Sequence, residues 1–224
     1  MLEDKNFAER LNILRAGVLG ANDGIISIAG VVIGVASATS NIWFILISAL
    51  SAIFAGVFSM AGGEYVSVST QKDTEEEEQA LLDRSPESAR ESLYQTFLSQ
   101  GDCETEAEVK VNQAFSKNPI KVLVEEKYGV DMEEITNPWH AAVSSFLSFS
   151  VGSLPPTLAI LLFPDPYRIP ITAVVVALTL ILTGYVSAKL GKAPVKQAML
   201  RNLAVGLLTM LVTYVVGQVF HVNV

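Results

Sequence analysis

The chain has 224 residues, half of them hydrophobic, and its formal net charge at pH 7 is −8. The charge is concentrated, because residues 70–137 hold 17 of the 23 acidic residues and 7 of the 15 basic ones. The remainder is too apolar for an ordinary soluble domain. The acidic segment would repel phosphates, which argues against nucleic acid as a partner.

Five apolar segments follow one another along the chain. A helix needs about 20 mainly apolar residues to cross a bilayer, and residues 15–39, 42–67, 139–163, 169–190 and 197–220 meet this length. The first is unlike a cleaved signal peptide, since it contains Asn22 and Asp23 and a second span follows at once. We therefore expect an all-α membrane protein with five transmembrane helices.

Basic residues predict the orientation of these spans. If the spans alternate in direction, 14 of the 15 Lys and Arg residues lie on one side and only Arg168 lies on the other. Short loops rich in basic residues stay in the cytoplasm. The N-terminus and residues 70–137 are therefore expected in the cytoplasm, and the C-terminus outside. The short chain fits a bacterial plasma membrane best.

The first span carries a carboxylate. Asp23 lies about eight residues into it, or about 12 Å along a helix. A carboxylate at this depth is costly and by default marks an ion or proton pathway. Because it can bind either a proton or a metal ion, it provides the exchange that an antiporter needs. We assign Asp23 and its neighbour Asn22 to a transport pathway.

Two pairs of glycines flank this aspartate. Gly20 with Gly24, and Gly30 with Gly34, are small-xxx-small pairs of the kind that lets membrane helices approach closely. They predict a dimer seam along the first span. In a homodimer, such a seam would bring two copies of Asp23 together.

The second span has a stripe of residues spaced four apart: Ala52, Gly56, Met60 and Glu64. The small residues predict a close-packed face, and we assign Met60 and Glu64 to the pathway. A thioether sulfur favours softer transition metals over Ca²⁺ or Mg²⁺. Taken alone, a methionine is more often packing filler than a ligand.

Residues 70–137 have repeated signals that start and stop helices. These are Ser85 with Pro86, Thr105 with Glu108, Asn118 with Pro119, and Gly129. The sequence thus predicts three parts. Residues 1–69 form an N-terminal amphipathic segment and spans 1 and 2, residues 70–137 form a small acidic helical domain in the cytoplasm, and residues 138–224 form spans 3 to 5.

Clustered carboxylates make this inserted domain a candidate metal-binding region. Oxygen ligands suit Mn²⁺, Fe²⁺, Mg²⁺ and Ca²⁺, and glutamates three or four apart share a helix face. The alternative is a solvated charged face, which is the usual meaning of a charge run. The candidate ligands are Glu75, Glu76, Glu78, Glu104, Glu108, Glu125 and Glu126.

Three stretches resemble the vacuolar iron transporter family: LRAGVLGANDGIISIAGVVIGVASA, AGVFSMAGGEYVSVSTQKDTE and NPWHAAVSSFLSFSVGSLPP. The resemblance implies a homodimer of five-span subunits with a metal-binding domain after span 2. It also implies a pathway between the subunits, lined by residues that match Asp23 and Met60. For a eukaryotic chain, the resemblance implies the vacuolar membrane. Three features depart from the family pattern, and one of them is the spacing of the glutamates after span 2. A second-span glutamate of some members falls near Ala52, and paired methionines of the inserted domain are replaced beside Glu125 and Glu126.

These observations predict a proton-coupled antiporter that exports Fe²⁺, Mn²⁺ or both, with the metal as substrate and no permanently bound cofactor. The alternatives are a passive divalent cation channel, a Ca²⁺ or Mg²⁺ exporter, and a membrane-anchored metal sensor. An enzyme is not expected, because neither His140 nor His221 lies deep in a span and no pair of nucleophile and base is visible.

Overall fold

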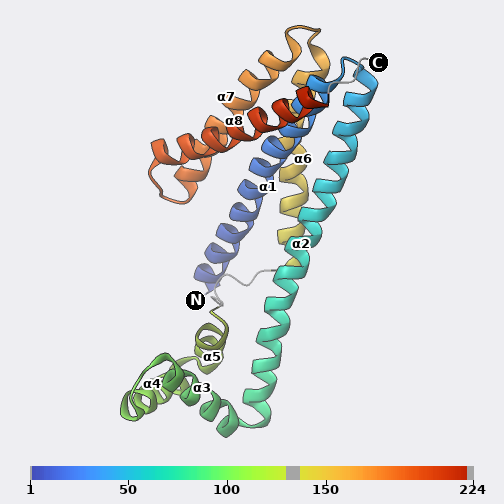
Figure 1. Ribbon diagram of the computed structural model, residues 1–224. Coiled ribbons are helices and arrows are strands. Elements are labelled where there is room, and N and C mark those ends of the chain that lie inside the picture. The colour runs from blue at the N-terminus through green and yellow to red at the C-terminus, as the bar shows by residue number, and fades with distance from the viewer. Residues whose placement is uncertain (1, 130–136, 221–224) are drawn as a thin grey trace. The chain divides into compact units, whose positions relative to one another are not determined.

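The computed structural model describes residues 2–129 and 137–220. Over these ranges the chain forms eight helices and no strands (Figure 1). The helices are α1 (Leu2–Ala38), α2 (Ile42–Arg84), α3 (Pro86–Gln100), α4 (Glu104–Lys117), α5 (Pro119–Tyr128), α6 (Pro138–Leu162), α7 (Arg168–Leu190) and α8 (Val195–Val219). Five of them, α1, α2, α6, α7 and α8, are long and apolar enough to cross a membrane, which confirms the predicted all-helical class with five candidate spans.

Helix α2 extends beyond the predicted span, which reaches residue 67. It continues without a break to Arg84. Residues 68–84 contain neither glycine nor proline, and most of them are good helix formers. The helix stops only where Ser85 precedes Pro86, which disfavours helical geometry at the residue before it. The expected boundary at residue 69 therefore lies inside a helix.

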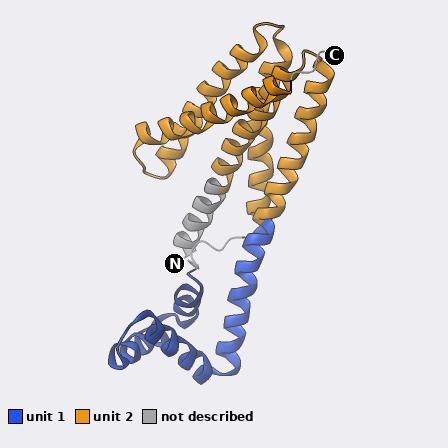
Figure 2. Cartoon of the chain, in the orientation of Figure 1, with its two compact units in different colours: residues 1–12, 65–138 blue, residues 13–64, 139–224 orange. Residues whose placement is uncertain are grey.

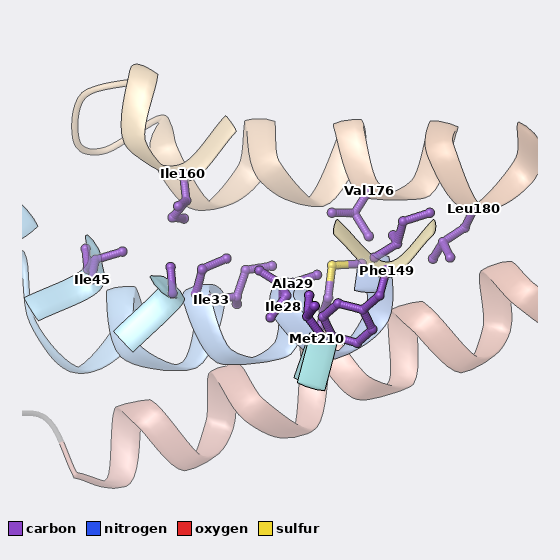
Figure 3. Packing of buried hydrophobic residues seen from close by; sticks show 13 residues of the cluster. Ile28, Ala29, Ile33, Ile45, Phe149, Ile160, Val176, Leu180 and Met210 are labelled. Atoms are coloured by element: carbon purple, nitrogen blue, oxygen red, sulfur yellow. The ribbon is translucent and has the colours of Figure 1, made fainter. Parts of the chain in front are cut away.

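The chain divides into two compact units, residues 1–12 with 65–138 and residues 13–64 with 139–224 (Figure 2). The second unit contains the apolar segments of all five long helices. Its core gathers side chains from each of them around α1 (Figure 3). The largest buried members are Ile28, Ile33, Ile45, Phe149, Ile160, Val176 and Leu180.

Glycines let α1 approach its neighbours at backbone distance. A Cβ atom on Gly24 would lie 2.4 Å from the carbonyl oxygen of Phe149 on α6, and one on Gly34 would lie 3.2 Å from the carbonyl oxygen of Thr213 on α8. The partner helices contribute glycines too, since a Cβ on Gly152 would lie 2.2 Å from the Ala21 carbonyl oxygen. Because lipid supplies no hydrophobic drive between helices, this close packing is a principal source of their association.

The register of these contacts gives the helix directions. Gly20 meets Ser145 and Gly24 meets Phe149, so numbers rise together along α1 and α6. The same holds for α1 and α8, where Gly30 meets Thr209 and Gly34 meets Thr213. Between α2 and α6, and between α7 and α8, the numbers run in opposite senses. Helices α1, α6 and α8 therefore run one way and α2 and α7 the other, as expected for five consecutive crossings.

Arg168 is a buried charge at one end of this unit. Only 8% of the residue is exposed. Its Nε donates to the Phe163 carbonyl (3.3 Å), and its Nη1 donates to the Ser40 carbonyl (3.5 Å) and lies 3.5 Å from the Asp165 carboxylate. The loop after α1 and the loop after α6 therefore meet at this end, as the predicted alternation of spans requires.

The other unit contains α3, α4 and α5, which bury Leu93, Val111 and Leu123 among themselves. Two of the predicted helix signals are confirmed. The Asn118 Oδ1 atom accepts from the backbone amide of Lys121 (3.4 Å), and Gly129 ends α5 with φ +67°.

The predicted start of α4 at Thr105 is wrong. The helix begins at Glu104, and the backbone amide of Cys103 donates to Glu106 Oε2 (3.4 Å). Gly101 ends α3 in the left-handed region, with φ +104°. Only Gly101, Asp102 and Cys103 separate the two helices, so α4 starts early. The glutamate that reaches back is consequently Glu106 and not Glu108.

Glu78 joins the end of α2 to α5. It is 3% exposed, and its Oε1 accepts from Lys127 Nζ (2.5 Å) and from the Tyr128 hydroxyl (2.7 Å). The hydrogen bond to Glu78 is the main cause that raises the pKa of Tyr128 from 10.0 to about 12, with burial second. These contacts hold α5 against α2 by charge-assisted hydrogen bonds, which are stronger than hydrogen bonds between neutral groups.

We expect Gly24→Ala to destabilise the protein by about 1–3 kcal/mol, because the new methyl group would collide with the backbone of α6. Gly62→Ala is the matched control, since among the described residues no atom other than those of its chain neighbours and its own helix backbone lies within 4 Å of its Cβ position, and alanine favours the helix by up to about 1 kcal/mol. Thermal unfolding of the purified protein in detergent measures both. Equal midpoints for the two variants would contradict the close contact.

We expect Tyr128→Phe to weaken the attachment of α5 by about 1 kcal/mol, a value reduced for screening because Tyr128 is 49% exposed. The folded-state pKa lies above the unfolded one, so this contribution is fully present below pH 10 and is lost as pH rises through about 12. The difference should therefore be constant between pH 6 and 9. Amide hydrogen exchange of α5 measures it, and Tyr94→Phe, whose hydroxyl makes no such bond, should leave exchange unchanged.

Candidate functional site

Asp23 lies within the membrane-spanning segment Ala16–Ala38 and is half-buried. Its Oδ1 accepts a hydrogen bond from Ser27 Oγ (2.6 Å), one turn along the same helix. Among the residues that the structure describes, no Lys or Arg lies within ion-pair distance of it. The carboxylate thus has one neutral donor and further lone pairs free to accept a cation or a proton.

The face of α1 that carries Asp23 also carries Leu19, one turn earlier. Leu19 is 54% exposed, while Gly20 and Gly24 beside this face are buried against α6. Farther along α1, Gly30 and Gly34 are packed against α8. All four predicted seam glycines therefore make contacts within their own chain. A seam between two copies stays a prediction, and it would have to use the neighbouring face with Leu19 and Asp23.

Asn22 belongs to a polar cluster that connects three helices. Its Oδ1 accepts from Asn202 Nδ2 on α8 (3.0 Å) and from Thr183 Oγ1 on α7 (3.2 Å), and its Nδ2 donates to Asn202 Oδ1 (3.3 Å). Of these three residues, only Asn22 was predicted from the sequence as part of the site. Thr183 and Asn202 are polar residues inside otherwise apolar spans, and this is the signal that could have indicated them.

Met60 and Glu64 lie on the predicted close-packed stripe of α2. Ala52 and Met60 pack against the buried core, and Gly56 lies under the ring of Phe149, so the close packing of this face is confirmed. Glu64 is half-buried. In the described ranges, no hydrogen bond or ion pair joins Met60 or Glu64 to Asp23. Their role in a pathway stays a prediction.

The glutamates at the end of α2 have unequal surroundings. Glu75 is half-buried, and Glu76 is exposed and lies 3.6 Å from Lys72 Nζ. Glu78, by contrast, is already neutralised by Lys127 and hydrogen-bonded to Tyr128, although its Oε2 is buried and accepts no hydrogen bond. A metal ion at Glu78 would have to displace Lys127, so this residue is the least available of the predicted ligands.

The remaining predicted ligands are spread over α4 and α5. Glu104 and Glu108 are exposed, Glu125 lies 3.6 Å from Lys121 Nζ, and Glu126 accepts from Gln100 Nε2 (3.0 Å). Within residues 2–129 and 137–220, no three His, Cys, Asp or Glu side chains are placed to hold one metal ion. A preformed metal site is therefore not assembled among them.

A hollow of about 500 Å³ lies between α3, α4 and α5. Three ammonium groups line it, from Lys110, Lys117 and Lys121, against one carboxylate, from Glu126. This charge balance does not suit a divalent cation, so the hollow is not a candidate for the metal.

Comparison with known proteins identifies the family of the chain. The profile of the VIT family matches residues 14–218. A vacuolar iron transporter homolog 3 from Arabidopsis thaliana is 33% identical over 93% of this chain and 84% of its own length. A vacuolar iron transporter homolog 1 from Oryza sativa subsp. japonica is 34% identical over 97% of this chain and 78% of its own.

A third relative, a vacuolar iron transporter from Acanthamoeba castellanii, is 34% identical over 91% of this chain and 77% of its own length. The three relatives and the family profile thus cover nearly the whole sequence, including all five long apolar helices. The chain is an integral membrane protein that belongs to the VIT family.

Proposed function

We propose that the protein exports a divalent transition metal, Fe²⁺, Mn²⁺ or both, from the cytosol in exchange for protons. The observation that carries this proposal is Asp23, a half-buried carboxylate within a span whose one hydrogen-bond partner among the described residues is the Ser27 hydroxyl. A carboxylate in this setting is costly unless it serves an ion or proton path. The names of the relatives, vacuolar iron transporters, support metal as the cargo.

Exchange follows from competition at one carboxylate. With no metal present, a proton neutralises Asp23 and removes the cost of a buried charge. A divalent ion that reaches the same oxygens brings two positive charges and displaces the proton. In a homodimer joined along the Leu19 and Asp23 face, two such carboxylates would share one cation, and Met60 would add a thioether that favours a softer metal.

The acidic unit would act on the cytoplasmic side by raising the local cation concentration. Residues 65–129 contain fourteen acidic and seven basic residues, and a surface of one sign concentrates counter-ions and speeds their arrival. The absence of an assembled cluster in the described ranges fits this diffuse attraction better than a tight site. The cytoplasmic position rests on the basic residues that flank the spans.

Asp23→Asn should abolish proton-coupled metal flux, because the amide keeps the shape and one oxygen but loses the exchangeable negative charge. Metal uptake and internal pH, recorded together in proteoliposomes under an imposed pH gradient, measure this. Asp165→Asn is the control, since Asp165 is exposed and lies outside the spans. Wild-type coupling in Asp23→Asn would remove this residue from the mechanism, and flux independent of the pH gradient in the wild type would indicate a channel.

Met60→Leu should reduce Fe²⁺ flux roughly tenfold and Mn²⁺ flux by less, because the loss of a ligand worth about 1.4 kcal/mol changes an affinity tenfold. Leucine is close in volume to methionine, so packing is largely kept. Met210→Leu is the matched control in the buried core, and it should not change the ratio of the two fluxes. The same ratio in wild type and Met60→Leu would show that the sulfur does not select the metal.

The combined change of Glu75, Glu76, Glu104 and Glu108 to Gln should raise the half-saturating metal concentration roughly threefold to tenfold at low salt and leave the maximal rate intact. Glu78 is left unchanged because it holds α5. The difference should shrink at about 1 M salt, where charges are screened beyond about 3 Å. Loss of all transport at saturating metal, in protein that stays folded, would instead place the acidic unit in the conduction path.

A further inference from the structure

The side chains of Asn22, Thr183 and Asn202 form a hydrogen-bonded cluster that joins three helices, α1, α7 and α8. The two asparagine amides bond reciprocally, with Asn22 Nδ2 to Asn202 Oδ1 (3.3 Å) and Asn202 Nδ2 to Asn22 Oδ1 (3.0 Å). Thr183 Oγ1 lies 3.2 Å both from Asn22 Oδ1 and from its own helix at the Leu180 carbonyl, so its proton has two acceptors.

Close packing surrounds this cluster. A Cβ on Gly184, next to Thr183, would lie 2.8 Å from the Cα of Met199, and one on Gly206, one turn after Asn202, would lie 2.1 Å from Leu180 Cδ1. The two helices α7 and α8 therefore form a tight pair that presents Thr183 and Asn202 together. In an apolar interior, polar groups like these are costly unless bonded, so the amide of Asn22 is held by this pair.

The next residue along the chain is Asp23. Its carboxylate accepts from Ser27 on its own helix, and among the residues that the structure describes no hydrogen bond or ion pair links it to another helix. Its direction in the bundle is thus set by the rotation of α1 about its axis. For a carboxylate about 5 Å from the axis, a rotation of about 12° moves the oxygens by about 1 Å. Displacements of this size are large for an ion site.

We propose that Thr183 and Asn202 are positioning residues, which hold the amide of Asn22 and thereby fix the rotation of α1 that aims Asp23. They act through Asn22 and do not themselves bind the cation. This proposal deepens the proposed function, because it names what orients the carboxylate on which transport rests, but the rotation itself can be measured without transport.

Labelling tests the rotation. Cys103 is the chain's one cysteine, so Cys103→Ser with Asp23→Cys gives a protein with a single thiol at position 23. Thr183→Val, which keeps the side-chain shape, or Asn202→Leu is then added to this protein. Either change should alter the rate at which a small methanethiosulfonate modifies the thiol at position 23 by roughly threefold or more, because that is the effect expected from the loss of one hydrogen bond between membrane helices. Thr179→Val is the matched control, because within the described part of the chain the Thr179 hydroxyl donates only to carbonyls of its own helix.

A second control uses the far end of the same helix pair. Gln218 Nε2 on α8 donates to the Ser37 carbonyl on α1 (3.1 Å), and Gln218→Leu should leave the labelling rate at position 23 unchanged. Thr183→Ser keeps the hydroxyl and should restore the wild-type rate. Unchanged labelling in folded Thr183→Val, or equal changes in Thr179→Val, would overturn the proposal. If Asn202→Leu does not fold, the labelling rate in Thr183→Val alone tests the proposal.

Transport in the protein with Asp23 intact gives the second readout. Thr183→Val and Asn202→Leu should each raise the half-saturating metal concentration roughly threefold or more, and the double variant should be no worse than the stronger single one, because both act through Asn22. Strictly additive effects would overturn the proposal. A wild-type protein that moves no metal would refute the proposed function, and the labelling would still decide whether the cluster orients α1.

Discussion

The approach of α1 to α6 and α8 at backbone distance is the contact on which the rest of the membrane unit depends. Inside a bilayer, van der Waals packing replaces the hydrophobic effect as the source of helix association. Glycines on both helices of each contact make this possible. Gly24 of α1 and Gly152 of α6 lie at one contact, and Gly34 of α1 and Gly217 of α8 lie at the other. With these faces occupied, α1 leaves Leu19 exposed and Asp23 half-buried. The packing thus selects which side of α1 is available to an ion.

Much of the fold could be predicted from local sequence. Span positions follow from hydropathy, and the ends of α5 follow from Asn118 and Gly129, because both signals act within one helical turn. The departures from the prediction have local causes too. Helix α2 continues past residue 67 because no glycine or proline interrupts it before Pro86. Helix α4 begins at Glu104, with Glu106 and not Glu108 reaching back, because Gly101 ends α3 just before it. A short connection, and not residue preference, decided that boundary.

The candidate site was predictable only in part, because its partners are distant in sequence. Asp23 is visible as a carboxylate in an apolar segment, whereas Asn22 meets Thr183 and Asn202 across 161 and 180 residues. Glu78 looked like its glutamate neighbours, yet it is the one that folding places against Lys127 and Tyr128. Charge pattern alone does not separate a carboxylate that attracts ions from one that stabilises a helix pair.

The contacts of Arg168 affect how one end of the membrane unit would respond to low pH. Under the proposed orientation, its end of the bundle faces the compartment from which protons enter. The two bonds that join the loops go from the guanidinium to the backbone carbonyls of Phe163 and Ser40, which do not titrate, whereas the titratable Asp165 lies in the same loop as Phe163 and does not join it to the other. The hydrogen bonds between these two loops therefore do not depend on a titrating acceptor, so this end of the bundle would keep its shape under the acid load that the proposed exchange at Asp23 requires.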